Sequence, residues 1–152
     1  MIELVTDLVI ELPRNQRDVI ATHVAADHPN EACGLLLGQR RNDRVLISQA
    51  VASANVSDQP HHRFEIDPVL RLRLQKAARE GGAAILGHYH SHPNGAARPS
   101  ATDRAGIYEP DLVWLIAAVK DGSLLEIAAY TPWADGDGFD EVELSENLGT
   151  TK

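Results

Sequence analysis

Cysteine is almost missing from this sequence, and so are long hydrophobic runs. Cys33 stands alone among 152 residues, which excludes an internal disulfide framework and a zinc cluster built from several cysteines. A single cysteine fits a reducing compartment. The longest apolar run, residues 112–119, is far shorter than the ~20 residues that a membrane-spanning helix needs. Residues 1–13 lack the leading basic residues of a secretory signal, so we expect a cytoplasmic protein without a membrane partner.

Positive charge is also scarce. The formal net charge is −8, which argues against a nucleic-acid partner because phosphate-backbone binding needs basic surface. The acidity is concentrated near the C-terminus, where residues 135–152 hold six acidic residues against one basic residue. We therefore expect one domain over residues 1–134, followed by an acidic segment over 135–152 that is partly disordered or forms one edge strand.

The hydrophobic pattern predicts three helices and several short strands. The expected helices cover residues 14–27, 68–80 and 100–108, the second capped by Asp67 and the third by Ser100. The expected strands cover residues 8–12, 33–37, 44–56, 63–66, 83–89, 112–119, 123–130 and 141–144. Because helices and strands do not alternate strictly, the predicted fold class is α/β with a mixed sheet.

Histidines gather in one short segment, where His88, His90 and His92 alternate along the chain. Alternate side chains of an extended segment point to the same side, so two of these imidazoles can reach one metal ion. Asp103, in the first turn of the next predicted helix, can supply a carboxylate to the same point. Two nitrogens and one oxygen suit zinc, and three protein ligands leave a fourth position for water. The spacing therefore predicts a catalytic metal site.

The same segment resembles a known family. His90-x-His92, seven further residues, Ser100, two more residues and Asp103 match the pattern of the JAMM (MPN+) metalloproteases. Upstream, Glu31 stands three residues before a Gly-Leu-Leu-Leu-Gly run, as the family's upstream glutamate does. The chain is most similar to the stand-alone prokaryotic members. Their fold, a mixed, curved central sheet flanked by helices in the JAMM/MPN (cytidine deaminase-like) architecture, is the one that the resemblance implies.

The resemblance also implies a role for each motif residue. His90, His92 and Asp103 would bind Zn²⁺, and Glu31 would be the general base for the attacking water. Ser100 would donate a hydrogen bond to the oxyanion of the tetrahedral intermediate. The implied reaction is peptidase or isopeptidase cleavage after the C-terminal Gly of a ubiquitin-like or sulfur-carrier protein that ends in Gly-Gly. Such an extended tail would bind in a groove beside a sheet edge.

Several alternatives stay open at this point. The chain could be a non-catalytic MPN binding module or a zinc hydrolase of small amides, and its oligomeric state is not encoded in any motif. We expect His88 to be buried beside the metal site rather than a ligand, and His61 and His62 to be exposed. Cys33 is expected to be a small buried hydrophobic residue, and we formulate the hypothesis that its oxidation impairs activity.

Overall fold

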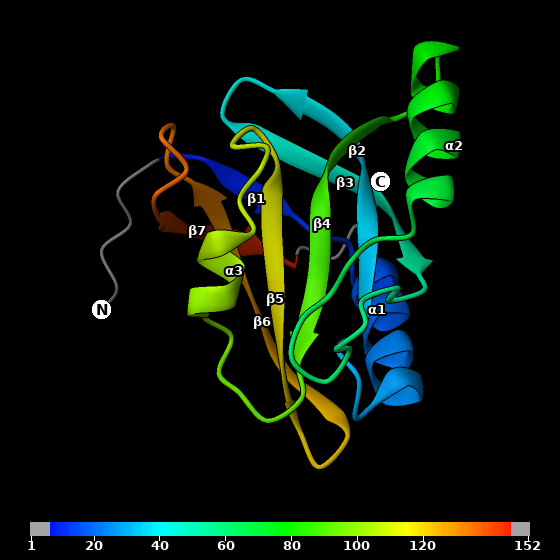
Figure 1. Ribbon diagram of the computed structural model, residues 1–152. Helices are drawn as coiled ribbons and strands as arrows, with labels where there is room; N and C mark the ends of the chain where they lie inside the picture. The colour runs from blue at the N-terminus through cyan, green and yellow to red at the C-terminus, as the bar shows by residue number, and fades with distance from the viewer. Residues whose placement is uncertain (1–6, 147–152) are drawn as a thin grey trace.

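A computed structural model describes residues 7–146 of the protein, which form seven strands and three helices (Figure 1). The strands are β1 (Val9–Glu11), β2 (Cys33–Arg41), β3 (Arg44–Ser53), β4 (Ala84–His92), β5 (Val113–Lys120), β6 (Ser123–Pro132) and β7 (Phe139–Ser145). The helices are α1 (Arg14–Asp27), α2 (Pro68–Arg79) and α3 (Ala101–Ala105). Within residues 7–146, no helix has the length and apolar composition needed to cross a membrane.

The strands form one mixed sheet that closes into a barrel in the order β1-β3-β2-β4-β5-β6-β7. The β2–β3, β2–β4, β5–β6 and β6–β7 pairs are antiparallel. The β4–β5, β1–β3 and β1–β7 pairs are parallel. The predicted α/β class with a mixed, curved sheet is confirmed, and closure of the sheet is the feature that the sequence did not predict.

Closure changes the position of the C-terminal strand. We expected an edge strand or a partly disordered segment over residues 135–152, whereas β7 pairs with β6 on one side and with β1 on the other. The reason lies in alternation: Val142 is buried and Leu144 packs against the core cluster, while Glu143 between them is exposed on the other side of the strand. This apolar face could not be recognised from the net charge of residues 135–152, which is strongly negative.

Other elements also differ from the predicted ones: β3 ends at Ser53 rather than at residue 56, and β4 continues to His92 rather than ending at residue 89. Strand β2 continues past Gly38, where a β-bulge shifts the register and the Leu46 carbonyl occupies the space of a Cβ atom. The predicted strand over residues 63–66 is reduced to one β-bridge between Asn55 and Ile66. Helix α3 ends at Ala105 rather than near residue 108, with Gly106 as its C-cap.

The two faces of the sheet carry different helices. Ile20 and Val24 of α1 join the largest core cluster, which also contains Tyr89 of β4. Leu70 of α2 packs with Cys33 on the opposite face. Because neighbouring residues of a strand alternate between faces, the residues on either side of Tyr89 point toward α2. This alternation places the alternating histidines on the α2 face.

We predict that Gly87→Ala destabilises the fold. Backbone atoms of Val113, the neighbour of Gly87 across the β4–β5 pair, occupy the space that a Cβ atom would need. The free energy of unfolding should fall by about 1–3 kcal/mol because the two strands must move apart. Gly106→Ala is the control, since the nearest atom to its Cβ would lie at 3.4 Å, an ordinary contact. Equal stability of the two variants in urea denaturation would contradict the prediction.

Candidate metal centre

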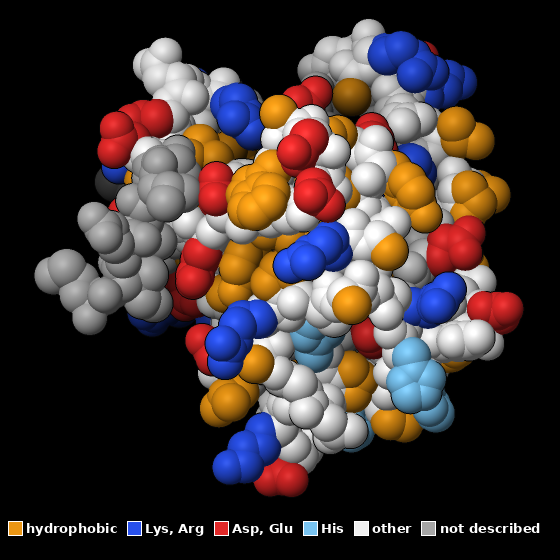
Figure 2. Space-filling model, turned by 60° about the vertical axis from the view of Figure 1, so that its left-hand side comes forward, with side chains coloured by type: hydrophobic (Ala, Val, Ile, Leu, Met, Phe, Trp, Pro, Cys, Tyr) orange, Lys and Arg blue, Asp and Glu red, His pale blue; other side chains and the backbone are white. Residues whose placement is uncertain are grey.

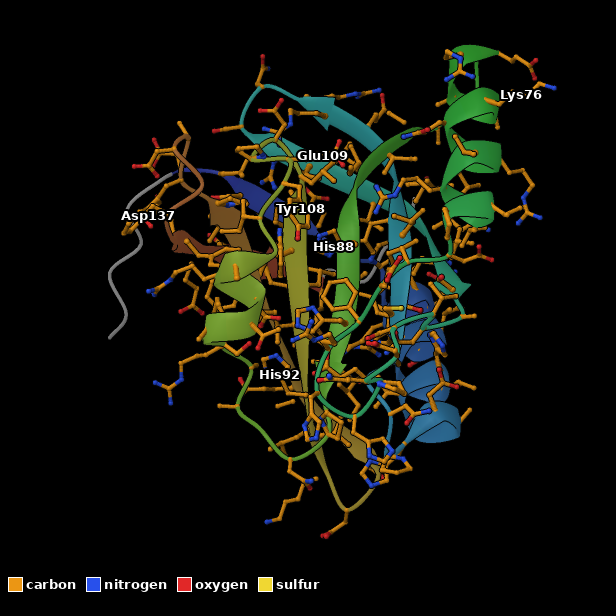
Figure 3. The ribbon with its side chains drawn as sticks, viewed as in Figure 1. Lys76, His88, His92, Tyr108, Glu109 and Asp137 are labelled. Carbon is orange, nitrogen blue, oxygen red and sulfur yellow. The ribbon has the colours of Figure 1, made fainter. Side chains whose placement is uncertain are left out.

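The motif residues come together at the end of β4. Candidate ligand atoms of His90, His92 and Asp103 all lie within 4.8 Å of one another. The His90 Nε2 atom lies 3.0 Å from Asp103 Oδ1, and the His92 Nε2 atom lies 3.0 Å from Asp103 Oδ2. The two Nε2 atoms are 3.1 Å apart. The structure therefore places these three residues where they can bind one metal ion (Figure 3 labels His92).

The tautomer of His92 shows that this cluster fits a cation. Its Nδ1 donates a hydrogen bond to the carbonyl oxygen of Ala96, 2.9 Å away, so in the neutral ring the proton is on Nδ1 and Nε2 carries a lone pair. That lone pair faces a carboxylate oxygen of Asp103 and the second imidazole nitrogen. Such an arrangement is repulsive unless a proton or a metal ion lies between the groups, and an outer hydrogen bond on Nδ1 is typical of metal-binding histidines.

Asp103 is positioned by the start of α3. Ser100 is the N-cap, and its Oγ accepts a hydrogen bond from the Asp103 backbone N–H at 3.0 Å. In return, Asp103 Oδ2 accepts from the Ser100 N–H at 2.9 Å, which completes a capping box. Burial opposes ionisation of Asp103, but the hydrogen bonds from His90 and His92 outweigh it and hold its pKa well below the usual range. The carboxylate is therefore ionised and available to a metal ion.

Glu31 reaches the same point through the register of β2 and β4. Cys33 lies opposite His90 in that pair. Beyond the strand end, the Ser91 N–H donates to the Ala32 carbonyl at 3.0 Å, and Ser91 Oγ accepts from the Ala32 N–H at 2.8 Å. The pairing thus continues for one more residue and places Glu31 next to His92.

The environment of Glu31 suits a group that exchanges protons. Its side chain is buried, and its Oε1 atom has no hydrogen-bond partner within residues 7–146. Burial raises the pKa of Glu31 to about 7; the positive charge of His92 lowers it and the negative charge of Asp103 raises it further. A carboxyl group with a pKa near neutrality can accept and release a proton at low cost.

Two residues that the sequence analysis missed hold the site together. The Asn55 side-chain N–H₂ donates to the carbonyl oxygens of Glu31 (2.9 Å) and Arg63 (3.0 Å), and its Oδ1 accepts from the Glu65 N–H (3.1 Å). Phe64, from the same connection, stacks on the His90 ring with centroids 4.4 Å apart. The pattern offered no means of finding either residue, because both act through a connection without regular secondary structure.

The predictions for three further histidines, His61, His62 and His88, agree with the structure, as does the predicted burial of Cys33. His88 is buried against Trp114, with ring centroids 4.4 Å apart, outside the three-residue cluster. His61 and His62 are exposed. Cys33 is fully buried, and burial raises the pKa of its thiol to about 12. A buried, protonated thiol reacts slowly with peroxide, which argues against the hypothesis that oxidation of Cys33 controls activity.

A cavity of about 650 Å³ opens beside the cluster. One wall is formed by residues 63–68 and Arg71 of α2, and the other by α3 and the connection that follows it. His88 and Trp114 line it as well, and so does the proposed ligand Asp103. Figure 3 labels His88 together with Tyr108 and Glu109 of the α3–β5 connection. The cavity therefore reaches one residue of the cluster, Asp103, whereas His90, His92 and Glu31 are not among the residues that line it.

The fold and this cluster define a JAB1/MPN-type domain with a His-His-Asp cluster that could hold a metal ion. The family described as prokaryotic homologs of the JAB domain matches residues 13–131, so the chain belongs to that family.

Several named relatives of the chain have names that describe proteolytic enzymes. The chain is 33% identical over 140 residues to a desampylase from Haloferax volcanii, covering 90% of this chain and 95% of the relative. It is 34% identical over 96 residues to a probable TtuB-protein conjugate cleaving protease from Thermus thermophilus (63% and 62% covered). It is 28% identical over 113 residues to a CysO-cysteine peptidase from Mycobacterium tuberculosis (74% and 75% covered).

Solved structures have the same fold. A protein from Desulfitobacterium hafniense superposes with a TM-score of 0.78 at 34% identity, covering 91% of this chain and 94% of the other. A JAB1/MPN domain protein from Archaeoglobus fulgidus superposes with a TM-score of 0.57 at 22% identity, covering 91% and 97%. The similarity to the Archaeoglobus fulgidus protein supports the fold alone. That fold agrees with the architecture expected from the sequence motifs.

We predict that the purified protein binds one zinc ion and that Asp103→Ala removes it. Losing a direct ligand should weaken zinc binding by more than about 100-fold, since loss of an outer hydrogen-bond partner alone costs ~10–100-fold. Because Asp103 also caps α3, Ser100→Ala is the matched control: it removes the capping hydroxyl and keeps all three ligand side chains. Zinc titration should show near-normal affinity for the control, and equal losses would mean that helix capping, not ligation, explains the effect.

We also predict that Asn55→Ala loosens the backbone around Glu31. Carbonyl groups of Glu31 and Arg63 and the N–H of Glu65 lose their partner, which should cost about 1–3 kcal/mol in unfolding free energy. Amide hydrogen exchange should speed up at Glu65 and stay unchanged in β5 and β6. Unchanged exchange at Glu65 would show that the connection keeps its shape without Asn55.

Proposed function

We propose that the chain is a zinc-dependent peptidase or isopeptidase that hydrolyses the amide bond after the C-terminal Gly of a ubiquitin-like or sulfur-carrier protein. The observation that carries the proposal is the buried, unpartnered Glu31 carboxyl next to the His90, His92 and Asp103 cluster. The relatives support it, since their names describe cleavage of TtuB conjugates and of CysO-cysteine. Because the single cysteine fits a reducing environment, we place the activity in the cytoplasm.

His90, His92 and Asp103 would hold the metal ion. Two imidazole nitrogens and one carboxylate oxygen are ligands that zinc prefers, and they leave a position open. Zinc bound there would supply Lewis-acid chemistry, polarising the scissile carbonyl and lowering the pKa of a water molecule.

Glu31 would move the proton. Its carboxylate accepts the proton of the attacking water and then passes it to the leaving amine, so that one residue is first base and then acid. A pKa of about 7 suits both steps. Burial of the side chain keeps bulk water from competing for that proton.

Ser100 would stabilise the negative charge that develops on the carbonyl oxygen. Its Oγ already accepts a hydrogen bond from the Asp103 N–H, so the hydroxyl proton remains free to be donated. The capping role and the proposed oxyanion role are therefore compatible, because they use the oxygen lone pair and the O–H group separately.

The cavity suits an extended chain end rather than a folded surface. It opens at the protein surface and reaches Asp103, so a flexible tail can enter while the body of the partner stays outside. Glycines at the end of such a tail add no side chains where the tail reaches Asp103.

We predict that Glu31→Gln removes cleavage and keeps the metal. The amide has nearly the same shape but cannot take up the proton, so kcat should fall by about 10²–10⁴. The measurement is hydrolysis of a Gly-Gly-linked conjugate, with zinc content determined on the same preparations.

Glu65→Gln is the matched control. Glu65 is exposed and lines the same cavity, but the proposal gives it no part in proton transfer, so its turnover should stay within about twofold of wild type. Full activity of Glu31→Gln would remove the general-base assignment. Hydrolysis of an amino acid amide without hydrolysis of the conjugate would favour a small-amide hydrolase.

A further inference from the structure

The wall of the cavity contains a polar group that the proposed mechanism does not use. His88 lines the cavity with only 7% of its surface exposed. Neither of its ring nitrogens forms a hydrogen bond with another residue in the range 7–146, and Nδ1 is also closed off from solvent. Because buried polar groups in proteins are nearly always paired, an unpaired imidazole in a cavity wall marks a position where a ligand group can pair with it.

The surroundings of His88 are flat and apolar. Its ring centroid lies 4.4 Å from that of Trp114, in an edge-to-face arrangement, and 5.4 Å from that of Phe64. Trp114 is the neighbour of His88 across the β4–β5 pair, and all three residues line the cavity. Among such groups the imidazole is neutral, because a charge would be buried without a partner.

A neutral imidazole carries one N–H group and one lone pair, and the position of the proton follows from access. A proton on Nδ1 would have no acceptor, since that atom is closed off and unpaired, whereas Nε2 is open to the cavity. Unpaired buried N–H groups are rarer in proteins than underused acceptors. His88 therefore presents an Nε2–H donor, and the complementary group of a ligand is a hydrogen-bond acceptor.

The charges around the cavity do not favour a charged ligand. The charged lining residues are two arginines and three acids: Arg63, Arg71, Glu65, Asp103 and Glu109. Arg71 is already paired with Glu109, 3.6 Å away. On the face of the molecule that Figure 2 shows, acidic and basic side chains are likewise interspersed. A neutral acceptor therefore fits these surroundings better than a carboxylate.

The position of His88 along β4 determines which residue of a bound tail it meets. His88 lies two residues before the candidate ligand His90 in β4, a separation of about 6.7 Å along a strand. The cavity runs from Asp103 to His88, and Figure 3 shows His88 between His92 and Tyr108. An extended tail whose last carbonyl lies at the ligands covers the same distance in two residues. The tail residue at His88 is therefore the third from the end, which directly precedes Gly-Gly.

We propose that His88, Phe64 and Trp114 form a pocket for the side chain that precedes Gly-Gly, and that this pocket selects a long, neutral side chain with a hydrogen-bond acceptor at its end, such as glutamine. The inference rests on the proposed function, from which it takes the path of the tail. The aromatic rings suit the planar amide, and the cavity of about 650 Å³ has room for it. Methionine would leave the His88 N–H unpaired, and lysine and arginine offer donors only. His88 is thereby a specificity-determining residue.

A comparison of tails and variants tests the pocket. Three Gly-Gly tails, linked to the same leaving amine, differ only in the preceding residue, which is glutamine, methionine or glutamate. Wild type should cleave the glutamine tail with about tenfold higher kcat/KM than the methionine tail, and the glutamate tail more slowly than the glutamine tail. His88→Phe keeps a flat ring without nitrogens, so the glutamine preference should fall below twofold. His88→Gln supplies an amide N–H and should restore part of it.

His62→Phe is the matched control. His62 is exposed and is not among the residues that line the cavity, so the same replacement should leave the tail preference unchanged. A folding defect in His88→Phe would lower the cleavage of all tails by one factor and would not change the ratio between them. An unchanged glutamine-to-methionine ratio in His88→Phe, or faster cleavage of the glutamate tail by wild type, would overturn the proposal.

Titration with the free tail peptides separates the pocket from catalysis. If wild type binds the glutamine tail more tightly than the methionine tail and His88→Phe does not, the pocket stands even when no conjugate is cleaved, and only the proposed function fails. If wild type binds neither tail, or binds both equally, the pocket proposal is wrong whatever the enzyme cleaves.

Discussion

The pairing of β2 with β4 is the constraint on which the site depends. Cys33 lies opposite His90, and Ser91 extends the pairing to Ala32 through a side-chain hydrogen bond and a backbone hydrogen bond. This register brings Glu31 to the metal ligands, although 59 residues separate Ala32 from Ser91. A slip of one residue would turn the histidines toward α1 and bury them among apolar side chains. The same slip would remove Tyr89 from the largest core cluster, where it is fully buried.

The electrostatics of the cluster follow from its burial. Glu31, His90 and Asp103 are all nearly inaccessible to water, and polar groups in that position need partners. Asp103 has hydrogen-bond partners in both imidazoles and in Ser100, whereas Glu31 Oε1 and His90 Nδ1 have none among the residues described. A protein that needed these residues only for stability would replace them with apolar ones. Their burial side by side fits a candidate metal centre with an adjacent group that can accept a proton.

The sequence predicted the parts of the protein that regular periodicity or spacing encodes. Helix α1 was expected at its observed bounds, and the convergence of His90, His92 and Asp103 followed from strand alternation and a capping serine. Sheet closure was not predicted, because the three apolar residues of β7 are interspersed with three acidic ones and the segment as a whole is acidic. Asn55 and Phe64 were also missed, since their roles depend on how an irregular connection folds back, and no local pattern encodes that.

Whether a site residue belongs to a regular element or to an irregular connection determines how rigidly it is held. His90 and His92 belong to β4, which has paired strands on both sides, and Asp103 is fixed by a capping box. Glu31 and Phe64 come from connections, and the Asn55 amide joins the two. The three candidate metal ligands are therefore preorganised by the sheet and by the capping box of α3. The connection that carries Phe64 is joined to Glu31 by the Asn55 side chain. Adjustment to a bound tail should accordingly occur in residues 55–65, next to the cavity, while the metal ligands stay in place.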